Sequence, residues 1–141
     1  MIKKVFITLF LCIILLHPQF IHADNSYDIE IFDPQENKVV KTVEPNQEIN
    51  NKVKDWINKI EEVYQSINPM PDNGYAIRFP IESSIHIQNR WIDENVKEVY
   101  LTIPENDDPC LIIFGRGNQP NFFEFPGQID ELSKLLGFQL K

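Results

Sequence analysis

Residues 46–67 read NQEINNKVKDWINKIEEVYQSI, and this stretch decides the fold. Its apolar residues recur at steps of three and four, which is the spacing of one stripe on an α-helix. They are Ile49, Val53, Trp56, Ile57, Ile60, Val63, Tyr64 and Ile67. Asn46 is a good N-cap because its side-chain oxygen accepts a backbone N–H of the first turn, and Pro69 disfavours helical backbone at Asn68. The pattern predicts a long one-sided helix over 46–67, which needs a sheet to lie on.

On both sides of that helix, apolar residues recur at every second position, the period of a strand with one buried face. Residues 27–32 and 38–43 predict a hairpin. After the helix, strands are expected over 75–87, 96–103, 110–114 and 121–125. Pro80 cannot donate to a ladder, so the strand over 75–87 is either an edge or bent at that residue. The run over 110–114 is apolar at every position, which indicates a central strand buried on both faces.

A final short helix is expected over residues 128–136, where apolar residues return to helical spacing. Gly137 is well placed to end it, and Phe138 to make the apolar contact that accompanies such an end. The order is therefore β-β-α-β-β-β-β-α. Strands joined by short turns pair antiparallel, so the predicted class is α+β. We expect one mostly antiparallel sheet, with the long helix packed on one face and the short helix at the C-terminus.

Residues 1–23 have the pattern of a secretory signal peptide. Lys3 and Lys4 precede an apolar run of about a dozen residues, which is short for a membrane span of roughly 20, and Ala23 ends a plausible cleavage site. We expect cleavage there, which leaves a single α+β domain over 24–141 that is exported from the cell. The alternative is that the segment is retained and anchors the protein in the membrane.

The remaining domain is acidic. Removal of the two leader lysines changes the net charge from −8 to −10. Such a surface repels phosphate backbones and no basic cluster interrupts it, which argues against nucleic-acid binding. Cys110 is the one cysteine of residues 24–141, so no internal disulfide is expected. Its place in an apolar run predicts a small buried side chain, with a reactive thiol or an intermolecular bridge as the alternatives.

Residues that carry chemistry are few. His86 is the one histidine of residues 24–141, and one histidine with one cysteine does not supply the usual zinc ligands. Ser84 and His86 lie on one strand rather than at a nucleophile elbow. We therefore expect no cofactor, no metal and no catalytic set. Calcium binding by the acidic turn that contains Glu105, Asp107 and Asp108 is an alternative, although the EF-hand spacing is missing.

The polar face of the strand that contains His86 is the best candidate contact surface. Glu82, His86 and Arg90 lie in a row there with Trp91 beside them, and such a row binds a peptide or sugar or is simply solvated. The leading hypothesis is a secreted, non-enzymatic module that binds a protein or peptide at the cell envelope. The alternative is a small hydrolytic or wall-acting enzyme that uses Glu82 or Glu124 with His86 as acid and base.

A frame of motifs resembles small exported proteins of spore-forming Gram-positive bacteria. The matching segments are 31–33 (IFD), 41–43 (KTV), 46–49 (NQEI), 68–71 (NPMP) and 103–106 (IPEN), followed by a Phe-rich hairpin. The likeness covers nearly all of the chain after the leader, and its motifs are structural rather than catalytic. Those proteins are functionally uncharacterised. The resemblance therefore implies a location outside the cell or in the Gram-positive envelope, and it carries over no site residue.

Overall fold

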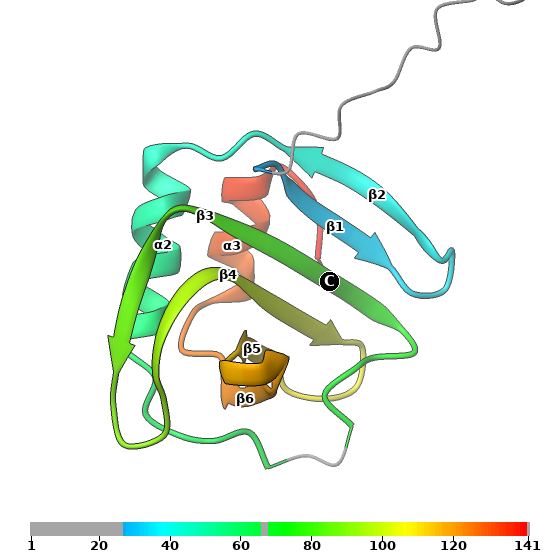
Figure 1. Ribbon diagram of the computed structural model, residues 1–141. Helices are drawn as coiled ribbons and strands as arrows, with labels where there is room; N and C mark the ends of the chain where they lie inside the picture. Colours follow the sequence, from blue (N-terminus) through cyan, green and yellow to red (C-terminus); the bar gives the residue numbers. More distant parts are fainter. Residues whose placement is uncertain (1–26, 66–67, 141) are drawn as a thin grey trace, which may run out of the picture.

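The computed structural model of the chain describes residues 27–65 and 68–140. Within these residues, six strands form one sheet and two α-helices pack on one of its faces; both helices lie behind the sheet in Figure 1. In chain order the elements are β1 (Ile29–Asp33), β2 (Lys38–Val43), α2 (Gln47–Asn58), β3 (Gly74–Gln88), β4 (Asp93–Pro104), β5 (Cys110–Phe114), the 3₁₀ turn η1 (Arg116–Asn118), β6 (Pro120–Glu124) and α3 (Ile129–Leu136). The predicted α+β class and the predicted order of elements are confirmed.

The sheet has the order β2-β1-β3-β4-β5-β6, and every neighbouring pair is antiparallel. Its helix-covered face forms the main core. The most fully buried strand residues there are Ile29, Ile31, Ile77, Phe79, Val99, Leu101, Ile103, Leu111, Ile113 and Phe123. On β4 the buried residues Val99, Leu101 and Ile103 fall at every second position, which is the period of a strand with one buried face. The first four residues of β5 are also buried, as expected for a central strand.

Helix α2 begins as predicted and packs by its apolar stripe. The Asn46 side chain accepts the backbone N–H of Ile49 at 2.9 Å, so the expected N-cap is present. Trp56 is 4% exposed and Ile60, just after the helix, is 8% exposed. The amphipathic spacing thus correctly predicts which side of the segment faces the sheet.

The same helix is shorter than predicted. It ends at Asn58, whereas the apolar spacing predicts helix up to Ile67, which lies outside the described residues. The backbone N–H of Lys59 is shared between two carbonyls, Asp55 at 3.0 Å and Trp56 at 3.1 Å, which is a tightened last turn.

Beyond that turn the chain becomes extended and runs along β6. The backbone N–H of Tyr64 donates to the carbonyl of Phe122 at 3.0 Å, and Val63 forms a bridge with Phe123. The Tyr64 ring packs with Cys110 on the face of the sheet opposite α2. Pairing with a sheet edge therefore overrides the helical spacing of these residues, as tertiary contacts often override local propensity.

Helix α3 ends in the predicted way. Gly137 has a φ of 57°, and its N–H donates to the carbonyl of Lys134 at 3.2 Å. The N–H of Phe138 donates to the carbonyl of Ser133 at 3.0 Å, which completes a Schellman motif. The Phe138 ring meets the Tyr75 ring edge-on with centroids 5.2 Å apart, which packs the end of α3 against β3.

A bulge interrupts the β3–β4 hairpin just after Pro80. The ladder is regular up to the pair Pro80 and Glu98, and it resumes at the pair Ile85 and Val96. Residues 81–84 of β3 therefore stand opposite Lys97 alone, which is an irregularity of the β-bulge kind. Pro80 lies beyond the residues of β3 that pair with β1 and at the start of the bulge, so both predicted alternatives, an edge and a bend, are present. The hairpin curves strongly at its far end in Figure 1.

Candidate functional site

Three hollows meet at Glu82, which lies on the bulge of β3, and we name them together the β3 groove. The largest, about 460 Å³, lies between the residues that precede β1, the start of α2, and β3. The second, about 420 Å³, opens between β3 and β4 and includes Arg78. The third, about 60 Å³, separates the bulge from α2. Tyr27 and Pro80 line both larger hollows, so the groove is continuous across this part of β3.

The groove exists because β1 ends its pairing with β3 early. The β1–β3 ladder covers only residues 76–78 of β3, and its last pair joins Glu30 to Arg78. Tyr27 and Asp28 precede β1 and are not part of the ladder. Across residues 27–65 and 68–140, no strand pairs with this side of β3 beyond Arg78. A free strand edge presents backbone N–H and C=O groups to any new partner.

Carboxylates dominate the largest hollow. Asp28, Glu44 and Glu82 line it, and none of the three is ion-paired within the part of the chain that the structure describes. Apolar surface comes from Tyr27, which is 56% exposed, and from proline residues on either side. The hollow therefore combines an apolar wall with carboxylates that have no ion-pair partner among the described residues.

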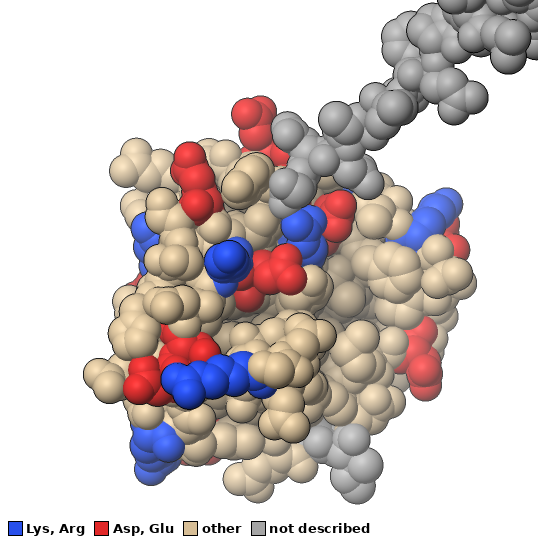
Figure 2. Space-filling model, viewed as in Figure 1, with Lys and Arg blue, Asp and Glu red and all other residues tan. Residues whose placement is uncertain are grey.

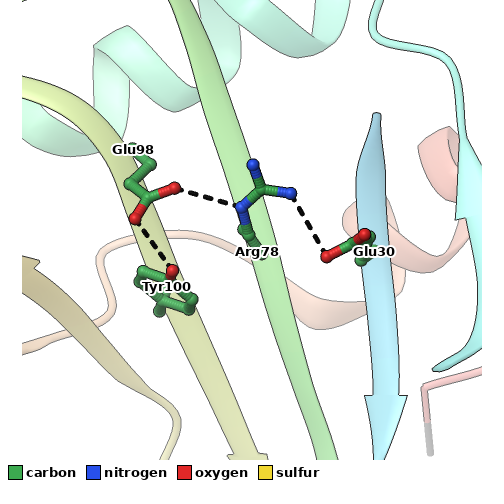
Figure 3. A network of polar contacts seen from close by, with 4 residues as sticks. All are labelled: Glu30, Arg78, Glu98 and Tyr100. Carbon is green, nitrogen blue, oxygen red and sulfur yellow. Dashed lines mark hydrogen bonds and ion pairs between the residues drawn. The ribbon is translucent and has the colours of Figure 1, made fainter. Parts of the chain in front are cut away.

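A polar network forms the lip of the groove on the open face of the sheet (Figure 3). Arg78 on β3 joins two neighbouring strands: its Nη1 lies 3.2 Å from Glu30 of β1, and its Nε lies 3.0 Å from Glu98 of β4. The Tyr100 hydroxyl donates to the other oxygen of Glu98 at 2.9 Å. Figure 2 views this face, where acidic and basic side chains lie next to one another among other residues.

The network shifts the ionisation of its members. Partial burial opposes the charge of the Arg78 guanidinium, but hydrogen bonds to Glu98 and Glu30 outweigh it and raise the pKa of Arg78. Burial, together with the hydrogen bond to Glu98, raises the pKa of the Tyr100 hydroxyl to about 12. At neutral pH the network is therefore a cation between two carboxylate groups with a neutral phenol at its end.

Replacing Arg78 with methionine is expected to lower the free energy of unfolding by about 1–2 kcal/mol, because the two carboxylates would face each other without their shared cation. Urea denaturation at neutral pH followed by circular dichroism measures this loss. Lys97→Met is the matched control, since Lys97 lines the same hollow and has no ion pair within the described ranges. An equal loss in the two variants would contradict a role for the network.

Of the four residues of the predicted contact surface, only Glu82 lines the β3 groove. Glu82 is exposed on the bulge and lines all three hollows. His86 lies further along β3 and does not line them; its Nε2 is 3.2 Å from the carboxylate of Asp93 on β4. The row of residues predicted from strand alternation is therefore divided by the bulge.

The other two predicted contact residues are engaged elsewhere. Arg90 donates from Nη2 to the backbone carbonyl of Glu61 at 3.2 Å, and its guanidinium carbon lies 4.0 Å from the ring centroid of its neighbour Trp91. Trp91 is half-buried, and its ring meets that of Phe123 with centroids 6.1 Å apart. Both side chains hold the far turn of the hairpin against the core.

The remaining candidate sites are not assembled by the fold. Glu124 lies on β6, and β4 and β5 separate that strand from β3, which carries His86. Among residues 27–65 and 68–140, no group of three His, Cys, Asp or Glu side chains is placed to hold a metal ion. The acidic turn with Asp107 and Asp108 is exposed.

Cys110 is fully buried, as its apolar run predicts. Burial raises the pKa of its thiol to about 12, so the sulfur is protonated and unreactive at neutral pH.

Comparison of the chain with protein-family models, with curated proteins and with solved structures found no match.

Sequence reasoning missed most of the groove. Tyr27, Asp28 and Glu44 come from segments far from β3 in the chain, and strand alternation does not reveal that they meet it. One signal was present: in the run over 75–87, the inward position after Ile81 is occupied by Ser83, a small polar residue. A polar residue at an inward position, three residues after a proline, marks the place where the regular ladder ends.

Proposed function

We propose that this protein is a secreted, non-enzymatic binding module that takes an extended polypeptide segment into the β3 groove by strand addition. The observation that supports the proposal is the free edge of β3 beyond Arg78, which is flanked by hollows of about 460 Å³ and 420 Å³. In strand addition the ligand backbone bonds to the edge, and pockets beside the edge receive alternate side chains.

The placement of the hollows fits an extended ligand. Asn50 of α2 lines the largest hollow, which therefore lies toward the helix-covered side of the sheet. The second hollow includes Arg78 and Glu98, whose network lies on the open face. Successive side chains of a strand point to opposite faces. A bound strand would therefore send neighbouring side chains alternately into the two hollows.

The two outer edges of the sheet are less suitable. Residues after α2 already cover β6, where the backbone N–H of Glu124 donates to the carbonyl of Glu62 at 3.1 Å. Strand β2 carries Lys38 and Lys41, and lysines on an edge strand oppose further pairing. Between Ile81 and Gln88 the edge of β3 has neither lysine nor proline.

The predicted leader and the resemblance to exported proteins support a location outside the cell, at the Gram-positive envelope, where the partner would be a protein or peptide. In the described part of the chain, no helix is long and apolar enough to cross a membrane. The hydrolytic alternative has no comparable support, because the hollows at Glu82 do not include His86.

Hydrogen exchange tests the binding mode. Peptides that bind the chain would be selected from a random displayed library, synthesised and added to it, and exchange of individual backbone amides would be followed by NMR. We expect slower exchange at residues 81–84, because strand addition gives these N–H groups new acceptors. Protection along β2 instead, or the absence of any binding peptide, would contradict the proposal.

A further inference from the structure

The unpaired carboxylates of the largest hollow indicate the class of peptide. We propose that the segment bound in the β3 groove is basic, and that a lysine or arginine side chain of it lies among Asp28, Glu44 and Glu82. This inference rests on the proposed function and names the ligand class of the same groove.

The largest hollow carries negative charge that no lining residue neutralises. No lysine, arginine or histidine lines this hollow, and its three carboxylates have no ion pair in the described ranges. Glu30 and Glu98, which lie next to the groove, are neutralised by Arg78. The fold therefore supplies a cation to the neighbouring acids and leaves those of the hollow to be satisfied by solvent or by a ligand. A cationic side chain is the complementary occupant.

The shape of this hollow favours a basic side chain over a metal ion. Within residues 27–65 and 68–140 no three carboxylates converge closely enough to hold a metal. Tyr27, Pro45 and Pro80 instead give the hollow an apolar wall along which the acids are spread. A lysine or arginine side chain has a long apolar stem and a charged end, and it matches such a wall. The exposed Tyr27 ring also offers a face to a cation.

The second hollow does not select for charge in the same way. Its acids Glu82 and Glu98 are accompanied by the cations Arg78 and Lys97. Because neighbouring residues of a strand point to opposite faces, only every second residue of the ligand would enter the acidic hollow. The inferred ligand therefore carries basic residues at alternate positions and tolerates other residues between them.

Fluorescence anisotropy with three labelled synthetic peptides tests this inference on the full chain. The peptides alternate threonine with lysine, with glutamine or with glutamate. We expect the lysine peptide to bind about tenfold more tightly than the glutamate peptide at low salt, with a smaller difference at high salt. Glu82→Gln should weaken binding of the lysine peptide about threefold to tenfold. Glu105→Gln removes the same charge outside the groove and should leave binding nearly unchanged.

The outcomes distinguish the two proposals. Equal affinity for all three peptides, with amide protection at residues 81–84, would overturn the basic class and leave the groove as a peptide site. Equal weakening by Glu82→Gln and Glu105→Gln would show an effect of net charge and would overturn the assignment to this hollow. Binding of none of the three peptides would overturn this inference, and the proposed function would also fail if the random library yielded no binder.

Discussion

Replacing Trp56 with alanine is expected to lower the free energy of unfolding by about 3–5 kcal/mol. The Trp56 ring joins α2 to the sheet, with its centroid 5.6 Å from that of Phe79 on β3 and 4.9 Å from that of Phe125 after β6. Both contacts are edge-on, and the side chain is 4% exposed. A β-carbon at Gly127 would lie only 2.7 Å from Trp56 Nε1, so the loop is packed directly on the indole.

The loss would be a large part of the total stability, since domains of this size unfold with about 5–15 kcal/mol. Urea denaturation monitored by far-ultraviolet circular dichroism measures it. Trp91→Ala is the matched control, because it removes the other tryptophan, which is only half-buried at the end of the hairpin. A loss for Trp56→Ala no larger than that for Trp91→Ala would show that α2 is not anchored through this ring.

The fold was largely predictable because most of its elements are set by local periodicity. The strand alternation, the Asn46 cap and the Gly137 end all act within a few residues, and each is present. The length of α2 was not predictable in this way. Val63 and Tyr64 fit a helical stripe and also fit an extended segment, and the choice depends on an open edge of β6 about sixty residues away in the chain.

The groove was predictable only in part, for a related reason. Glu82 was identified because a charged residue on a strand face is exposed whatever the strand pairs with. The point at which β1 leaves β3 depends on sheet order, which periodicity does not contain. The bulge after Pro80 also changes which side chains share a face: Val99 and Val96 are both buried although three positions separate them. A row from Glu82 to Arg90 drawn by strict alternation therefore crosses a break in the sheet.

The bulge and the Arg78 network lie close together on β3. The network joins β1, β3 and β4 at the last pair of the β1–β3 ladder, and the bulge begins three residues further along β3. The Arg78 network thus lies directly beside the unpaired edge of β3. Bulges often occur next to functional sites because they turn side chains and end pairing. For the proposed strand addition, an edge held open beside an ordered network would lower the ordering cost of binding.

Raising the pH from 9 to 12 is expected to destabilise the protein progressively, with about 2–3 kcal/mol lost through Cys110 alone at pH 11. In the unfolded chain a thiol ionises near its ordinary pKa of 9.0, whereas burial holds the pKa of Cys110 at about 12 in the fold. Between these values the unfolded state binds fewer protons than the native state, so stability falls as pH rises. Below pH 9 the thiol is protonated in both states and this contribution is constant.

The Tyr100 hydroxyl adds to the same trend, since its pKa is raised from 10.0 to about 12. Urea denaturation at a series of pH values measures the slope, and Cys110→Ala is the decisive comparison because it removes the thiol and keeps every other titrating group. Above pH 9 the stability of the variant should fall less steeply than that of the parent chain, and Tyr100→Phe should reduce the slope above pH 10. Parallel curves for the parent and Cys110→Ala would mean that the thiol ionises freely in the folded state, which its complete burial on the inner side of the Tyr64 ring argues against.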